Sequence, residues 1–223
     1  MIRGSRCLSV GAAMAMLVAC GNRPEQYVLP SQVMDFGVLY KDNCAGCHGQ
    51  NGRHGAARPL NDPLYLALAG KEKLMNVIAK GVPRTSMPAF AIKAGGTLTD
   101  QQVARLADQI EARWSQPGEF AGVALPPYSA DLGDREHGKA VFVAYCSQCH
   151  GDGGTPGSKG GPVVNPAYLA LVSDQSLRTT VIVGRADQDI PNWRTYTPGH
   201  PMTSPEISDV VAWLSAQRKL PGN

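Results

Sequence analysis

The chain has 223 residues, of which 43% are hydrophobic, 6% aromatic and 17% charged, a balance typical of soluble globular proteins. Its 21 basic and 18 acidic residues leave a formal net charge of +3, which argues against nucleic-acid binding because that function favours a strongly basic surface. The length suffices for one large domain or two small ones, and the 17 prolines and 25 glycines favour small, loop-rich domains.

Residues 1–19 have the pattern of an export signal. A basic start, MIRGSR, precedes the apolar run CLSVGAAMAMLVA, which glycine and serine interrupt. The run is shorter than the roughly 20 residues that a transmembrane helix needs, so we expect it to be cleaved and not retained as a membrane span. Cleavage also removes Arg3 and Arg6, which leaves the mature chain nearly neutral.

The end of the leader, Leu17-Val18-Ala19-Cys20, resembles the lipobox of bacterial lipoproteins. This resemblance implies cleavage before Cys20 and attachment of a diacylglycerol to its thiol. The mature protein would then be anchored on the periplasmic side of a bacterial membrane, with residues 20–31 as a lipidated tether. The alternative is an ordinary secretory signal in which the cysteine occurs by chance.

Two copies of one cysteine motif lie in the remainder of the chain. Apart from Cys7 in the leader and Cys20, every cysteine belongs to a C-x-x-C-H motif, which is the attachment signature of c-type haem. The two thiols form thioethers with the haem vinyl groups, and the histidine binds the iron. We therefore predict two covalent haem c groups, haem 1 and haem 2. Haem 1 is assigned to Cys44, Cys47 and His48, and haem 2 to Cys146, Cys149 and His150.

The surroundings of the motifs bear on two other uses of C-x-x-C. A zinc site needs further ligands nearby, and a thioredoxin-like redox pair follows a strand in a β-α-β pattern. The sequence has neither context. Instead, a predicted helix precedes each motif and places an aromatic residue, Tyr40 or Phe142, one turn before the first cysteine. We expect both rings to be buried.

The motifs belong to a longer internal repeat. Residues 63–90 align without gaps to residues 166–193, and each copy begins with a capping residue followed by proline, which starts a helix. A second helix in each copy ends at a glycine suited to a C-cap. Behind capping boxes at Thr99 and Thr203, apolar residues recur at helical spacing. One helical fold is therefore predicted to occur twice.

The segment between the copies, residues 115–134, is rich in proline and glycine and lacks periodicity, so it is a predicted linker. It separates two predicted all-α domains, residues 32–114 and 135–221. Units of this size are small for a hydrophobic core alone. We expect a covalently held haem to complete the core of each.

The order of these elements resembles class I cytochrome c domains, twice over residues 32–220. That order is helix, C-x-x-C-H, proline-containing loop, short helices, Met-Pro and closing amphipathic helix. The resemblance implies a diheme cytochrome c of the kind that serves as a periplasmic electron carrier or as a subunit of a respiratory complex. In that family a proline after the motif offers its carbonyl to the proximal histidine. Pro59 and Pro162 match this position, and such an acceptor would fix the orientation and basicity of the imidazole.

The second iron ligand differs between the copies. Met87, in a Ser-Met-Pro sequence, is the expected distal ligand of haem 1 because a thioether is a soft donor to iron. Its counterpart in the alignment is Ile190, which cannot ligate. We predict Met202 as the ligand of haem 2, with an open iron position as the second possibility and His200 as the third. Met202 aligns with Leu98, so the alternative is a core role.

The resemblance implies electron transfer and not enzymatic catalysis. We expect electrons to come from a quinol-oxidising complex or a dehydrogenase and to leave for a terminal acceptor such as an oxidase, through transient contacts with redox proteins of the respiratory chain. A haem subunit fixed inside a larger complex would have the same sequence features. The alternative function is a five-coordinate haem 2 that binds or reduces a small ligand such as peroxide, nitric oxide or carbon monoxide.

Polar residues elsewhere give this alternative little support. Asp187, Asp189 and Arg194 lie near the isoleucine of the second copy, but we interpret them as solvent-exposed and find no clear acid–base pair. The isolated histidines His54 and His137 are likewise expected to be solvated. The glycine-rich stretch GDGGTPGSKGGP lacks the ending of a phosphate-binding loop, so we interpret it as the loop beneath haem 2.

Overall fold

The computed structural model describes residues 27–157 and 159–218. The predicted leader and the lipobox cysteine Cys20 lie outside the described residues. Within the described ranges the chain is helical, and its β-type pairing is limited to isolated bridges, which confirms the predicted all-α class. None of the described helices combines the length and apolarity needed to cross a membrane.

The first unit comprises the helices that precede the predicted linker. Asp62 caps α3 by accepting from the N–H of Tyr65, and Thr99 forms the predicted capping box with Gln102 at the start of α4. α3 bends at Gly70, whose φ of 64° interrupts the helical backbone. The elements are η1 (Pro30–Gln32), α1 (Phe36–Asn43), α2 (Ala45–His48), α3 (Pro63–Lys80), η2 (Ile92–Ala94) and α4 (Asp100–Trp114).

The second unit repeats this order with one difference. Ser173, which aligns with Gly70 of the first unit, is an N-cap, so two separate helices replace the bent α3. Thr203 forms the second predicted capping box, with Glu206. The elements are α5 (Arg135–Tyr145), α6 (Ser147–His150), α7 (Pro166–Ala170), α8 (Asp174–Val183), η3 (Ala186–Gln188) and α9 (Ser204–Ala216).

Aromatic residues ahead of the cysteine motifs anchor both cores, as predicted. Tyr40 is 3% exposed and packs edge-on against Trp114 of α4, with ring centroids 5.4 Å apart. Phe142 is 1% exposed and packs against Trp213 of α9 at 4.5 Å. In each unit the first and last helices are therefore joined by an aromatic pair, which holds the helix that leads into the cysteine motif.

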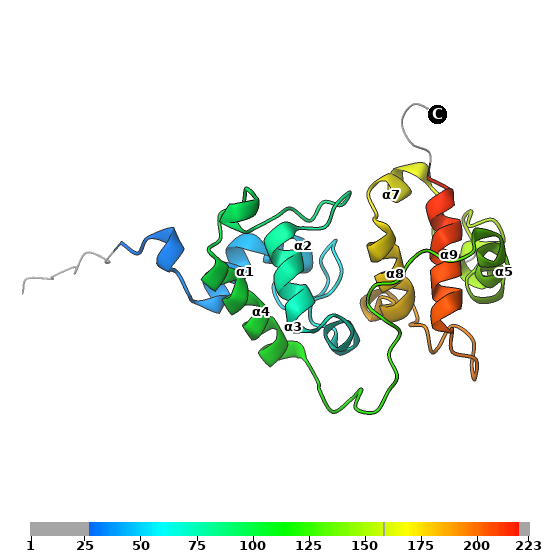
Figure 1. Ribbon diagram of the computed structural model, residues 1–223, viewed down its shortest axis with the longest axis horizontal. Helices are drawn as coiled ribbons and strands as arrows, with labels where there is room; N and C mark the ends of the chain where they lie inside the picture. The colour runs from blue at the N-terminus through cyan, green and yellow to red at the C-terminus, as the bar shows by residue number, and fades with distance from the viewer. Residues whose placement is uncertain (1–26, 158, 219–223) are drawn as a thin grey trace, which may run out of the picture.

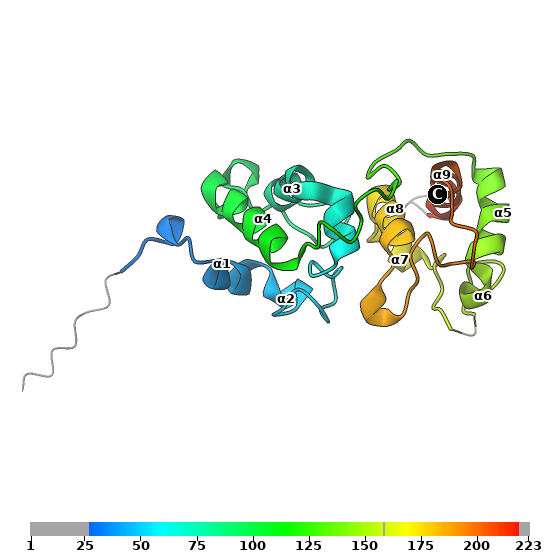
Figure 2. The ribbon, with the colours of Figure 1, turned by 90° about the horizontal axis from the view of Figure 1, so that it is seen from below.

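The two units lie side by side along the long axis of the molecule, with α3 and α8 in contact across the boundary (Figures 1 and 2). The linker runs from α4 along this boundary toward α5 (Figure 1). It is bound to α8 of the second unit. The buried guanidinium of Arg178 donates to the carbonyl of Pro127 at 3.0 Å, and the Gln175 amide donates to the carbonyl of Tyr128 at 2.7 Å.

Candidate haem-binding sites

Each C-x-x-C-H motif folds as one short helical turn. The N–H groups of Cys47 and His48 both donate to the carbonyl of Cys44, at 3.2 and 2.9 Å. In the second unit the carbonyl of Cys146 accepts from the equivalent residues at 3.1 and 3.0 Å. The turn brings two thiols and an imidazole together, and all four thiols are free of disulfides. This donor set fits the covalent haem predicted from the motif.

The proximal histidines are fixed by backbone carbonyls, but not by the predicted ones. His48 Nδ1 lies 2.7 Å from the carbonyl oxygen of Arg58, and His150 Nδ1 lies 2.8 Å from that of Gly161. The assignment of this role to the carbonyls of Pro59 and Pro162 was wrong by one residue. Proline restricts the residue before it to extended backbone, and it is the carbonyl of this preceding residue that reaches the imidazole.

These contacts determine the state of both imidazoles. A carbonyl can only accept a hydrogen bond, so Nδ1 carries the proton and Nε2 keeps its lone pair for a metal. Burial lowers the pKa of His48, an effect that the bond to the Arg58 carbonyl opposes and nearby Arg185 reinforces. The neutral form, which is the form that binds iron, is therefore favoured.

Glycines allow the loops after the motifs to approach the cysteines and histidines closely. A Cβ added to Gly160 would lie 2.5 Å from Nδ1 and 2.6 Å from Cε1 of His150. A Cβ on Gly55 or Gly157 would collide with the carbonyl of the second cysteine of its motif. The glycine-rich stretch after the second motif is thus packed against the predicted proximal ligand of haem 2, in agreement with its interpretation as the loop beneath that haem.

The thiols do not have the character of a zinc site. Burial, and then the neighbouring cysteine of the motif, raises the pKa of both Cys44 and Cys146 to about 12. Zinc binds thiolates and would need ligands beyond one motif. Within the described part of the chain, no group of three or more His, Cys, Asp or Glu side chains could hold a metal ion.

The segment that contains Met87 has the same backbone arrangement in both units. The N–H of Val82 donates to the carbonyl of Met87 at 3.1 Å, and that of Arg185 donates to the carbonyl of Ile190 at 3.0 Å. Met87 and Ile190 are both partly buried. Ile190 therefore stands where the first unit has its methionine, as the alignment predicted.

The loop before α9 places Met202 at the position of Leu98. The N–H of Leu98 donates to the carbonyl of Phe90 at 2.8 Å, and that of Met202 donates to the carbonyl of Trp193 at 2.9 Å. Both side chains are buried, at 5% and 2% exposure. This equivalence favours packing for Met202, whose role as an iron ligand stays a prediction. His200 lies on the exposed turn that precedes it.

The interpretation of Asp187 as solvated was wrong. Its carboxylate receives two hydrogen bonds from Arg185, both at 2.9 Å, and the two side chains are only 5% and 13% exposed. These bonds lower the pKa of Asp187 below its usual value. The ion pair lies next to Ile190, as its place in the sequence predicted. The charges of Asp187 and Arg185 neutralise each other. Asp189 and Arg194 are exposed, as predicted.

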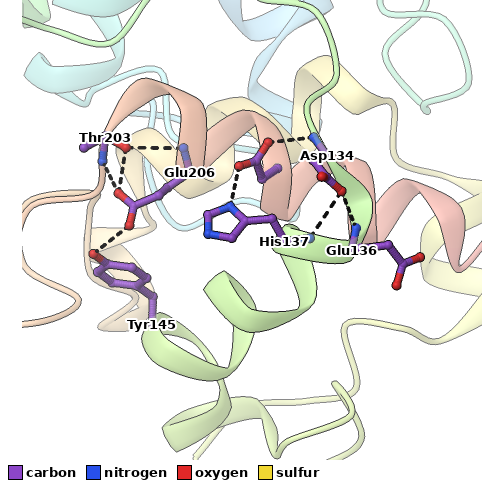
Figure 3. A network of polar contacts seen from close by, with 7 residues as sticks. Asp134, Glu136, His137, Tyr145, Thr203 and Glu206 are labelled. Atoms are coloured by element: carbon purple, nitrogen blue, oxygen red, sulfur yellow. Dashed lines mark hydrogen bonds and ion pairs between the residues drawn. The ribbon is translucent and has the colours of Figure 1, made fainter.

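His137 and His54 are both exposed, as predicted, but His137 also has a partner that was not predicted. His137 Nδ1 donates to Asp209 on α9 at 2.7 Å (Figure 3). This bond raises the pKa of His137, and the negative charges of Asp134 and Glu206 act in the same direction. The pair joins α5 to α9. Neither member is close in sequence to the other, so no local pattern could predict it.

Comparisons with known proteins agree with the duplicated fold. A family model described as cytochrome c oxidase, cbb3-type, subunit III, matches residues 31–110 and again residues 133–214. A cbb3-type cytochrome c oxidase subunit CcoP of Azospirillum sp. (strain B510) is 27% identical over 69% of this chain and 53% of its own length. The FixP subunit of Bradyrhizobium diazoefficiens is 26% identical over 86% of this chain and 63% of its own.

Two further matches differ in extent. The FixPc subunit of Rhizobium leguminosarum bv. viciae is 33% identical over 51% of this chain and 37% of its own length. The chain therefore spans only 37% to 63% of these three curated relatives. Among solved structures, the Kuenenia stuttgartiensis reducing HAO-like protein complex Kustc0457/Kustc0458 has 18% identity and a TM-score of 0.45, over 86% of this chain and 100% of its own.

Proposed function

Because the chain belongs to the cbb3-type cytochrome c oxidase subunit III family, we propose that it passes electrons to a terminal acceptor such as an oxidase. The chain is a diheme cytochrome c with one covalent haem c for each matched segment. The observation that carries the proposal is the pair of matching turns, each with two free thiols and a histidine whose Nδ1–H is held by a carbonyl.

The residues have separate parts in this function. The cysteines of each motif would hold the haem by thioethers, and the histidine Nε2 would bind its iron, which gains and loses one electron. Met87 is proposed as the distal ligand of haem 1. The protein's own contribution is to fix these groups, because an iron whose ligands stay in place exchanges electrons with little rearrangement. The haem 1 residues are Cys44, Cys47 and His48, and the haem 2 residues are Cys146, Cys149 and His150.

The place of the protein in a respiratory chain is part of the same proposal. The relatives are subunits of cbb3-type oxidases by name, and the chain matches only part of their length. We infer an oxidase as the acceptor and a quinol-oxidising complex or a dehydrogenase as the donor. Lipidation at Cys20 on the periplasmic side of the membrane is proposed from the lipobox alone.

Haem content and electron delivery test the proposal separately. A pyridine haemochrome assay should find two haems in the wild-type chain and one in each double variant, Cys44→Ala/Cys47→Ala and Cys146→Ala/Cys149→Ala. The pre-reduced protein should then be oxidised by oxidase-containing membranes in the presence of oxygen, and cyanide should block the oxidation. Two haems that stay reduced under these conditions would refute the oxidase as acceptor while leaving the cofactor assignment intact.

Anchoring requires its own measurement. Mass spectrometry of the membrane-extracted protein should find a diacylated N-terminus at Cys20, and Cys20→Ser should release the protein from the membrane or leave it as uncleaved precursor. A mature N-terminus at another residue, without lipid, would remove the lipoprotein assignment. The electron-transfer proposal does not depend on this result.

A second candidate function, ligand binding at haem 2, is favoured by one observation. Ile190 occupies the place of Met87, and Met202 occupies the place of Leu98, so no methionine of the second unit stands where the first unit has its predicted ligand. Rapid carbon monoxide binding by the reduced wild type, unchanged in Met202→Leu, would support an open iron. Binding only after Met202→Leu would support Met202 as the ligand, and His200→Ala serves as the control for the loop.

A further inference from the structure

Arg58 connects the support of one predicted haem ligand to the other unit. Its carbonyl accepts the hydrogen bond from His48 Nδ1 at 2.7 Å. Its guanidinium crosses the boundary between the units, where Nη2 donates to Thr180 Oγ1 at 2.7 Å and Nη1 donates to the carbonyl of Gly184 at 3.2 Å. Thr180 belongs to the last turn of α8 and Gly184 is its C-cap. A single residue thus contacts both units.

The side chain of Arg58 is not needed for the contact with the histidine. In the second unit the equivalent carbonyl belongs to Gly161, which makes the same bond to His150 with no side chain at all. The arginine therefore requires another explanation, and the cross-boundary bonds supply one. The two units are similar in fold, but only the first has a side chain at this position, and that side chain joins the units.

The site on α8 suits a cation from outside the helix. The C-terminal end of a helix carries a partial negative charge and carbonyls without partners in the helix, and it favours positive groups. The last turn of α8 contains no basic residue of its own. Arg58 provides that charge from the first unit, and its planar group offers two donors in a fixed orientation.

Aromatic residues from both sides of the boundary surround this contact. The Arg58 guanidinium carbon lies 5.7 Å from the ring centre of buried Tyr65 on α3, within the range of a cation–π interaction. Burial raises the pKa of Tyr128 in the linker and of Tyr196 in the second unit, and the positive charge of the Arg58 guanidinium opposes this rise in both. The contact is therefore desolvated on several sides, where a charged hydrogen bond is strong.

We propose that Arg58 is a positioning residue that docks the loop supporting His48 onto the C-terminal end of α8 and so holds the two haem units in one arrangement. The docking itself follows from the contacts above, and its importance for electron exchange between the haems rests on the proposed function. Loss of the side chain should leave both histidine contacts intact, because they use backbone carbonyls.

Hydrogen–deuterium exchange of the full-length, haem-loaded protein tests the docking. Arg58→Ala should accelerate exchange of the amides at the end of α8, residues 181–184, on the order of tenfold, the size expected for loss of a hydrogen bond from a charged donor. Thr180→Val removes one acceptor from the other side of the boundary and should affect the same amides. Arg58→Lys keeps the charge with fewer donors and should restore part of the protection. Arg105→Ala, at an exposed arginine of α4, is the control.

Two further readouts separate docking from a local effect. Because the charge of Arg58 acts on His48, its loss should lower the potential of haem 1 in Arg58→Ala but not in Thr180→Val. Equilibration of electrons between the haems, followed after pulse radiolysis, should slow in both variants. Faster exchange confined to residues 55–60, with α8 unaffected in both Arg58→Ala and Thr180→Val, would overturn the proposal. A wild type with fewer than two haems would instead refute the proposed function, whereas unchanged exchange at α8 in haem-loaded variants would refute the docking alone.

Discussion

Two adjacent glycines beneath the predicted proximal ligand of haem 2 allow a matched test of the site. A Cβ on Gly160 would lie 2.5 Å from Nδ1 of His150, whereas a Cβ on Gly161 would meet nothing within 4 Å. Gly160→Ala and Gly161→Ala therefore add the same methyl group to neighbouring residues of one loop. Only the first should disturb the imidazole.

The size of the effect follows from these contacts. Ordinary contact needs about 3.4 Å or more, so the loop or the ring of His150 must move by roughly 1 Å, enough to break the 2.8 Å bond from Nδ1 to the Gly161 carbonyl. Overpacking costs about 1–3 kcal/mol and the lost hydrogen bond about 1 kcal/mol. We expect Gly160→Ala to lower the free energy of unfolding by about 2–4 kcal/mol. Gly161→Ala should be neutral or stabilise by up to about 1 kcal/mol.

Thermal unfolding and redox titration measure the two consequences. For a unit of this size the loss corresponds to a fall in Tm on the order of 10–20 °C, followed by far-ultraviolet circular dichroism of the haem-loaded variants. The potential of haem 2 should rise in Gly160→Ala, because an imidazole without its Nδ1 hydrogen bond is a less basic ligand and stabilises ferric iron less. Equal Tm values and equal potentials for the two variants would refute the assignment of this glycine contact.

Three other changes test separate contacts. The pKa of His137 is raised by Asp209 in the folded state, so the pair should stabilise the protein fully below the unfolded pKa of about 6.5 and lose this effect as the pH rises through the folded pKa. His137→Phe should abolish that change in urea titrations between pH 5.5 and 9, and an unaltered pH dependence would exclude the pair as its source. Gln102→Met should cost about 1–3 kcal/mol in the same assay, because the buried amide donates to two backbone carbonyls of the N-terminal segment that would lose their partner. Phe142→Ala should cost about 3–5 kcal/mol by opening a cavity against Trp213, and a loss below 1 kcal/mol would contradict its place in the core.

The features predicted correctly from sequence are those set by neighbouring residues. The capping boxes at Thr99 and Thr203 need only a threonine and a partner three residues later, and the burial of Tyr40 and Phe142 follows from helical spacing. The duplicated pattern also placed Ile190 at the position of Met87. Each of these predictions depends on a short stretch of chain or on the comparison of two such stretches.

The features that were missed depend on contacts between distant segments. Which carbonyl reaches His48 is decided by the path of a loop ten residues away, so the prediction named a proline and the structure uses Arg58. The docking of Arg58 on α8 joins residues more than 120 positions apart. The burial of Asp187 was missed for a related reason: its ion-pair partner Arg185 is only two residues away, but the low exposure of the two side chains comes from packing that sequence does not reveal.

The linker is attached to α8, so the second unit cannot be cut from the first at the end of the linker without loss of contacts. Arg178 is 3% exposed, and its guanidinium divides its hydrogen bonds between the carbonyl of Pro127 and the hydroxyls of Ser204 and Ser208. A fragment that started at residue 135 would leave this buried cation short of one acceptor, at a cost of about 1–3 kcal/mol. The second unit should therefore be expressed from before residue 127, with part of the linker as its own N-terminal segment.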